Sequence, residues 1–396
     1  MKANLLLLGA LLIGCSSSTP PDAETAAGAA AQTSGNGVAV NANATGAASL
    51  GGTSAASLGG ADPVGAAGSA VNATNAGAPG TGTRNAGCAI WDAIPSGETL
   101  LTIGQDTGEI DQYSAAFGAP GGVMLYTNVA DLAGFGAEVN FGTGAQSLPH
   151  WTEQTAPLAI QLGVSLKKSV GSDACASDQL AAINSHALDG QISSMAVELA
   201  ALRRPVLLRF GYEFDNQDCH RYAPQAYAQA FRHFAEVFDT LGARNVQLVW
   251  HAWGGAPLDI SPWYPGDEYV DLVGVSLFPL AEMPGKVAAV AQFAEQHHKP
   301  LMVAEAAPQS AHPPSDPTSW DAWYQPLFEF VAQHDVRVLS YINQDWNAQS
   351  VWASQGVWGN SRLQGTPLAA RWRDALGAAR FLKSGPSLYA SLACHD

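Results

Sequence analysis

Residues 206–215 read VLLRFGYEFD, an apolar run that ends in carboxylates. The next segment, Pro224–Leu241, carries aromatic residues at spacings of four, three and four, which predicts an amphipathic helix. A second apolar run, Val246–Trp250, follows it. Strand, helix and strand in this order predict one βαβ unit of a parallel sheet.

The same alternation recurs along the rest of residues 88–396. Apolar strands without a polar face indicate burial on both sides of the sheet. Eight such units match a (β/α)8 TIM barrel in number and size, so this α/β fold is predicted. The rival, an open doubly wound sheet, favours a glycine-rich turn after its first strand, but residues 104–108 read GQDTG and lack GxGxxG. The predicted strands are Leu100–Ile103, Val123–Tyr126, Ala159–Leu166, Val206–Phe210, Val246–Trp250, Leu272–Leu277, Leu301–Ala304 and Val336–Ile342; further helices are predicted at Val287–His298, Ser319–His334 and Leu368–Leu382.

Residues 1–87 have a different composition. All 34 Phe, Trp and Tyr residues lie after residue 90. Residues 1–15, MKANLLLLGALLIGC, resemble a bacterial lipoprotein signal whose Cys15 is lipidated; an ordinary secretory signal is the alternative. Residues 16–87 are rich in Ala, Gly, Ser and Thr, which predicts a disordered, flexible linker. Either signal predicts an extracytoplasmic protein, and the lipidated one predicts a lipoprotein of the outer membrane or cell surface that contacts the membrane only through its anchor.

Four cysteines remain if Cys15 is lipidated. Cys88 and Cys394 bracket the predicted domain, and Cys175 and Cys219 lie inside it. Three pairings are possible, and the nested one, which joins the outer two and the inner two, is expected in an oxidising compartment. A metal site is the alternative, but no CxxC or HxxxH spacing indicates one.

Composition excludes several classes of function. The formal net charge of −16 argues against nucleic-acid binding, which needs a basic surface. The chain has no GxSxG, P-loop or HExxH run, so serine hydrolysis by a nucleophile elbow, nucleotide hydrolysis and zinc proteolysis are not expected. Neither a cofactor nor a metal is expected, and the protein is expected to be a monomer.

Two glutamates follow predicted strands at the same end of the barrel. Glu213 follows the fourth strand and Glu305 the seventh. Barrel enzymes carry their chemistry at the C-terminal ends of the strands. Paired carboxylates there suit glycoside hydrolysis, in which one protonates the leaving oxygen while the other attacks the anomeric carbon or activates water. The alternative is structural pairing, Glu213 with Arg209 and Glu305 with a nearby base.

The strand-end glutamates resemble those of clan A glycoside hydrolases, most closely family 26, the β-mannanase group. That family carries Arg-Pro-x-His-Glu-x-Asn after strand 4, where this chain has Arg209, Tyr212, Glu213 and Asp215. The resemblance implies a retaining mechanism with Glu213 as acid/base, Glu305 as nucleophile and a mannan-type substrate. It also implies that Arg209, Tyr212 and Asp215 bind substrate. Tyr212 and Asp215 depart from the family's histidine and asparagine.

The resemblance also bears on two other positions. Strand 6 ends at Phe278, where the family offers a tyrosine that hydrogen-bonds the nucleophile. Trp346 stands where the family places a tryptophan that stacks on sugar.

Other residues are candidates for substrate contact on their own chemistry. Trp250 can offer an aromatic face, and His251 can bond a hydroxyl or orient a carboxylate. Asp106 is either a hydroxyl acceptor or a helix cap. For each aromatic and histidine, an ordinary core role is the alternative.

The residues and the resemblance together predict a tethered glycoside hydrolase that cleaves a β-linked polysaccharide or oligosaccharide. The resemblance alone implies that it is retaining and mannanase-like. The alternative is a carbohydrate-binding lipoprotein that kept the barrel and lost activity. A third possibility is a barrel that serves as a structural or protein-interaction module.

Overall fold

The computed structural model describes residues 87–154, 156–167, 178–216, 220, 222–254, 259–278 and 283–396. Its central sheet is a closed barrel of parallel strands. The order runs β2-β3-β6-β7-β8-β9-β10-β11, and β11 pairs with β2 to close the ring. The predicted (β/α)8 barrel is therefore confirmed, and the open sheet is excluded.

All eight predicted strands are present, with small differences at their ends. Their bounds are β2 Thr99–Gly104, β3 Gly122–Asn128, β6 Ala159–Ser165, β7 Val206–Phe210, β8 Val246–Ala252, β9 Leu272–Leu277, β10 Leu301–Ala306 and β11 Val338–Ile342. Short antiparallel pieces, β4 (Val139–Asn140) and β5 (Ala145–Gln146), lie in the connection after β3.

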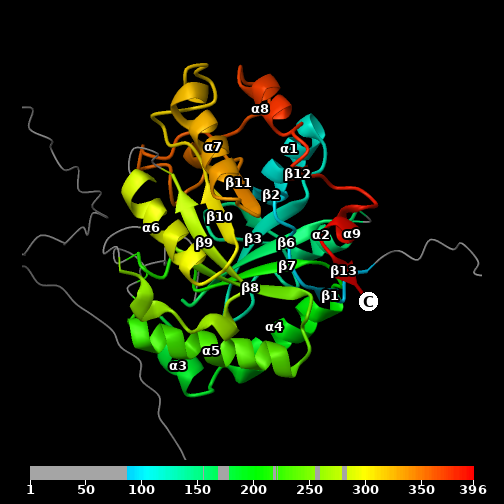
Figure 1. The fold of residues 1–396 in the computed structure, drawn as a ribbon, viewed down its shortest axis with the longest axis vertical. Coiled ribbons are helices and arrows are strands. Elements are labelled where there is room, and N and C mark those ends of the chain that lie inside the picture. Colours follow the sequence, from blue (N-terminus) through cyan, green and yellow to red (C-terminus); the bar gives the residue numbers. More distant parts are fainter. Residues whose placement is uncertain are drawn as a thin grey trace, which may run out of the picture. The chain divides into compact units, whose positions relative to one another are not determined.

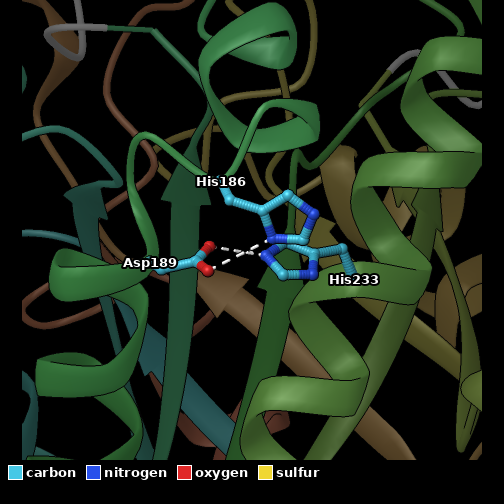
Figure 2. A group of neighbouring side chains, drawn as sticks. All are labelled: His186, Asp189 and His233. Carbon is cyan, nitrogen blue, oxygen red and sulfur yellow. Dashed lines mark hydrogen bonds and ion pairs between the residues drawn. The ribbon is translucent and has the colours of Figure 1, made fainter.

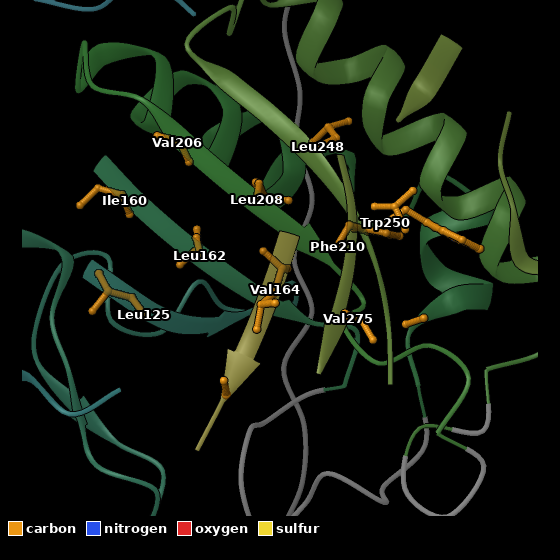
Figure 3. Close-up of a cluster of buried hydrophobic side chains, with 14 of the residues drawn as sticks. Leu125, Ile160, Leu162, Val164, Val206, Leu208, Phe210, Leu248, Trp250 and Val275 are labelled. Carbon is orange, nitrogen blue, oxygen red and sulfur yellow. The ribbon is translucent and has the colours of Figure 1, made fainter. Parts of the chain in front are cut away.

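Helices follow the strands around the outside of the barrel (Figure 1). α5 buries the aromatic stripe that the spacing predicts: Tyr227, Phe231, Phe234 and Phe238 all face the sheet layer. Figure 3 shows the strand side of this contact, where Ile160, Leu162, Val206 and Leu208 belong to the same buried cluster. The helices are α1 Thr107–Phe117, α2 Leu148–Thr152, α3 Leu180–Asn184, α4 Asp189–Ala201, α5 Pro224–Thr240, α6 Met283–Gln296, the π-helix η5 Trp320–Tyr324, α7 Gln325–Gln333, α8 Ala369–Ala375 and α9 Leu388–Ser391, with 3-10 turns η2 Ser261–Trp263, η3 Asp267–Tyr269 and η6 Trp346–Ala348.

One predicted helix is too long. The segment Leu368–Leu382 is helical only over α8, and Phe381–Leu382 form the short strand β12, which pairs in parallel with the start of β2. The helix ends beside Gly377, whose N–H bonds the carbonyls of Arg373 and Asp374. Glycine just past the last turn is a common helix terminator, and the strand forms because β2 offers free backbone groups at that edge.

The two ends of the described domain meet at the N-terminal end of the barrel. β1 (Ile90–Trp91) pairs antiparallel with β13 (Cys394–His395), and a disulfide joins Cys88 to Cys394. Both ends pack against the bottom layer of side chains inside the barrel, including Leu100. The outer half of the nested disulfide prediction is confirmed, whereas Cys175 and Cys219 lie outside the described residues.

The predicted signal and linker, residues 1–15 and 16–87, fall almost wholly outside the described residues, as does Cys15. Among the helices that the structure does describe, none combines the length and the apolar character needed to cross a bilayer.

Candidate active site

Glu213 lies just beyond β7 at the C-terminal mouth of the barrel. Gly211 has φ of +54°, and a Cβ there would lie 2.7 Å from Leu166 Cδ1, so this turn requires glycine. Glu213 itself has φ of +53°, a left-handed conformation that is uncommon for residues other than glycine. Its carbonyl lies 2.7 Å from Nδ1 of the buried His220. The turn therefore holds Glu213 in a conformation that is rare elsewhere and frequent at functional sites.

Glu305 reaches the barrel interior through a bulge in β10. Met302 and Ala304 face the interior, so strict alternation would turn the next side chain outward. The pairing of β10 with β9 shifts register between Val303 and Glu305. A bulge of this kind re-aims a side chain. Glu305 consequently joins the interior residues, where its carboxylate accepts a hydrogen bond from Arg209.

Arg209 is the buried cation at the centre of this mouth. It comes from β7 and is fully buried, and its Nη1 donates to Glu305 and, at 3.3 Å, to His251 Nδ1. The guanidinium carbon lies 5.0 Å from the ring centroid of Tyr126 and 5.3 Å from that of Tyr212. Ion pairing and cation–π contacts together offset the cost of burying this charge.

A chain of hydrogen bonds runs from Arg209 to the second glutamate. Neutral His251 accepts from Arg209 through Nδ1, and its Nε2 donates to Ser276 Oγ at 3.0 Å. Ser276 in turn donates to Glu213 Oε1 at 2.6 Å. Burial first, and then the charge of Arg209, lower the pKa of His251, which keeps the imidazole neutral as this order of donors requires.

The two glutamates have different surroundings. Glu305 faces the guanidinium, whereas Glu213 is bonded by a neutral hydroxyl. Burial, followed by the nearby charge of Glu305, raises the pKa of Glu213 to about 8. Glu213 therefore carries a proton near neutral pH, which is the state a general acid requires.

Of the two structural pairings considered for the glutamates, that of Glu305 with a nearby base is observed and that of Glu213 with Arg209 is not. The base that pairs with Glu305 is Arg209 itself. Both side chains lie at one mouth and interact electrostatically. Phe278, which stands where the resemblance leads us to expect a tyrosine, packs edge-on against Trp358 at 4.9 Å, and Glu305 accepts a hydrogen bond from Arg209.

Two of the predicted contact residues, Trp250 and Asp215, have structural partners. Trp250 points away from the barrel interior, stacks on Phe214 at 4.4 Å and donates to the carbonyl of Trp263, so it is a core residue. Asp215 is fully buried, and its carboxylate accepts from the backbone N–H groups of Trp253 and Gly254. It thereby fixes the start of the loop after β8.

Asp106 is the N-cap of α1. Its Oδ1 accepts from Glu109 N at 3.0 Å and its Oδ2 from Ala145 N at 2.6 Å. Of the two roles that the sequence left open for Asp106, the helix cap is the one observed.

An aromatic cluster lies beside the glutamates, packed against Tyr126 and Tyr212. Trp346 is only 3% exposed, and Trp358 stacks on it with ring centroids 5.0 Å apart. Trp352 and Trp358 are partly exposed. Trp346 is thus a buried ring that packs against the other two. Within this cluster, Trp352 and Trp358 are the indoles that a ligand can reach.

Three further residues of this site were not predicted from the sequence. Ser276 and Tyr126 hold the glutamate network, and Gln161 of β6 donates at 2.7 Å to the carbonyl of Ala304, next to Glu305. Each lies within an apolar strand and belongs to no local motif. Only their positions in the strands could have indicated a role, because polar residues inside a barrel must find hydrogen-bond partners.

A family model described as glycosyl hydrolase family 26 matches residues 150–337, which include both glutamates. A β-1,3-xylanase from a Vibrio species is 29% identical over 328 residues, covering 76% of this chain and 69% of that protein. A β-1,3-xylanase from an Alcaligenes species is 28% identical over 328 residues, covering 76% and 68%. The chain is a distant relative of glycoside hydrolase family 26.

Solved structures of family 26 share the barrel. A β-mannanase from Bacteroides ovatus has a TM-score of 0.54 at 15% identity, covering 72% of this chain and 90% of the other. A modular endo-β-1,4-mannanase from Cellulomonas fimi has a TM-score of 0.54 at 14% identity, covering 78% and 79%. At these identities the likeness concerns the fold alone. The family match and the curated relatives make this family 26 relative a glycoside hydrolase.

Proposed function

We propose that this protein is a retaining glycoside hydrolase with Glu213 as acid/base and Glu305 as nucleophile. The observation that carries the proposal is the difference between the two carboxylates at one barrel mouth. One faces a buried guanidinium, and the other has a pKa raised to about 8. A carboxyl group that burial keeps protonated is suited to the acid role, and the other carboxyl group, beside a cation, to the role of nucleophile.

The proposed reaction has two steps. In the first, a Glu305 oxygen attacks the anomeric carbon while Glu213 gives its proton to the leaving glycosidic oxygen, which forms a glycosyl ester on Glu305. In the second, Glu213 takes a proton from water, and the resulting hydroxide displaces Glu305 from the anomeric carbon. Because Ser276 bonds Glu213 Oε1, the transferred proton belongs to Oε2.

The proposed substrate is a β-linked polysaccharide, with β-1,3-linked xylan the first choice. The curated relatives named β-1,3-xylanases are 28–29% identical, whereas the mannanases are 14–15% identical. This difference supports the proposal of xylan over the mannan that the family resemblance implied. Trp352 and Trp358 supply aromatic faces for sugar rings, because the C–H faces of pyranoses pack on indoles.

The non-catalytic alternative is disfavoured by the network. A barrel that only binds carbohydrate gains nothing from keeping a glutamate protonated beside a buried ion pair, since burying such groups costs stability. The missing tyrosine, which favours that alternative, is offset by the hydrogen bond from Arg209.

We also propose, from the N-terminal sequence, an extracytoplasmic monomer attached to a membrane through lipidated Cys15. The described chain begins at Gly87, beside Cys88, which packs at the barrel end opposite the glutamates.

The experiment is hydrolysis of β-1,3-xylan, β-1,4-xylan, mannan, glucomannan and β-1,3-glucan by the full chain, Glu213→Ala and Glu305→Ala. Cleavage of one substrate, with a loss of at least about a thousandfold in either variant, supports the proposal. Binding of a glycan without cleavage supports the non-catalytic alternative. Cleavage that survives both substitutions contradicts the assigned roles.

A further inference from the structure

A second group of titratable side chains lies in the helical layer outside the barrel. His186 lies in the turn between α3 and α4, Asp189 is the first residue of α4, and His233 lies within α5. Figure 2 shows the Asp189 carboxylate directed at both imidazole rings. None of these residues takes part in the proposed hydrolysis.

The three donor groups converge closely. Asp189 Oδ1 lies 2.6 Å from His233 Nε2, and Oδ2 lies 3.2 Å from His186 Nδ1. One ligand atom from each residue lies within 4.8 Å of the other two. Donors around a tetrahedral zinc ion, at about 2.0–2.1 Å from the metal, are separated by about 3.3 Å. The three donor atoms therefore lie close to the separations found among zinc ligands.

The chemical nature of the donor atoms indicates which metal ions this cluster can bind. Two imidazole nitrogens and one carboxylate oxygen suit zinc and neighbouring transition metals, whereas calcium and magnesium prefer oxygen ligands. The side chains are also reachable from solvent, with exposed fractions of 64% for His186, 41% for Asp189 and 15% for His233. An ion can enter without unfolding either helix.

We propose that His186, Asp189 and His233 form a Zn²⁺ site that joins the turn before α4 to α5. The ion takes His186 Nδ1, His233 Nε2 and one Asp189 oxygen, and water completes the coordination. The nitrogens bind zinc as neutral imidazoles, so any proton held in the two hydrogen bonds to Asp189 is released to solvent. Because the ligands come from two separate elements, zinc binding stabilises their contact.

The test is titration of the EDTA-treated, dialysed full chain with ZnCl₂ by isothermal calorimetry. We expect one equivalent to bind at this site and to raise Tm by linkage. His186→Ala, Asp189→Asn and His233→Ala each remove a ligand and are expected to weaken binding at least about tenfold. Co²⁺ provides a second readout, because its visible absorption reports a tetrahedral nitrogen and oxygen environment.

The matched control is His150→Ala, which removes a histidine that faces a single carboxylate, Asp111, at 3.2 Å. This variant is expected to bind zinc like the unaltered chain. Circular dichroism checks that each variant is folded. Zinc affinity that is unchanged in all three ligand variants, or no zinc binding by the full chain, overturns the proposal. Neither result bears on glycoside hydrolysis, because the glutamates are untouched.

Discussion

Ser276 of β9 donates a 2.6 Å hydrogen bond to Glu213, which stands just beyond β7. The same hydroxyl accepts a hydrogen bond from His251, which in turn accepts one from Arg209. Ser276 therefore links Glu213 to the buried guanidinium. A donor to a carboxylate stabilises its charged form and so lowers its pKa. In this mouth that effect opposes burial, which raises the pKa of Glu213 to about 8.

The pH dependence of kcat/KM should reflect this acid. Activity is expected to fall above about pH 8, as Glu213 loses the proton that it must donate. Ser276→Ala removes the donor, so the pKa of Glu213 rises and the alkaline limb moves to higher pH. Thr99→Val is the control, since its buried hydroxyl bonds the carbonyl of Val336 at the opposite end of the barrel. An alkaline limb that does not move in Ser276→Ala contradicts this account.

Glu213 should also make stability depend on pH. Its pKa is about 8 in the folded state, above the ordinary value of 4.5, so the folded state holds a proton that the unfolded chain releases. Stability from this group is complete below about pH 4.5 and is lost as pH rises to about 8. The Gln side chain of Glu213→Gln cannot ionise. The Tm of this variant minus the Tm of the unaltered chain should therefore increase as pH rises across that interval. A difference in Tm between the two proteins that stays constant with pH would show that Glu213 does not titrate in this way.

The contributions of Arg209 and Glu305 to the free energy of unfolding should depend on each other, because the two side chains form a buried ion pair. Arg209→Met leaves Glu305 without its cation and is expected to lower the free energy of unfolding by about 3–5 kcal/mol. The double variant Arg209→Met/Glu305→Gln should recover part of that loss, because no unpaired charge remains. Denaturant unfolding of the four proteins completes the cycle. Additive losses would mean that the two groups are not coupled.

The disulfide should stabilise the domain without affecting its chemistry. Cys88 and Cys394 are 306 residues apart, so their bond constrains a long loop of the unfolded chain. Replacing both by serine is expected to reduce stability by about 2–5 kcal/mol. Since the bond lies at the N-terminal end of the barrel, kcat/KM at 25 °C should be unchanged. A large fall in kcat/KM in a folded variant would show coupling between the two ends.

The strands and both glutamates were predictable because period and strand-end position are local properties of a sequence. The helical stripe of α5 and the outer disulfide were predictable for the same kind of reason. The bulge that turns Glu305 inward was not, because it depends on register with β9. Trp250 was misjudged as a candidate because alternation places it outside while its neighbour His251 points in. The cluster of His186, Asp189 and His233 was not predictable from local patterns, because His233 is distant in sequence from the other two.

The most direct test of the central claim uses an activated aryl β-glycoside of the sugar that the protein cleaves, with and without azide. A good leaving group needs no proton, so Glu213→Ala should still form the glycosyl ester on Glu305. Azide should then restore turnover and yield the β-glycosyl azide. Glu305→Ala should lack the ester, and any azide product should be the α-anomer. A β-azide from Glu305→Ala, or no rescue of Glu213→Ala, would contradict the assignment of the two glutamates.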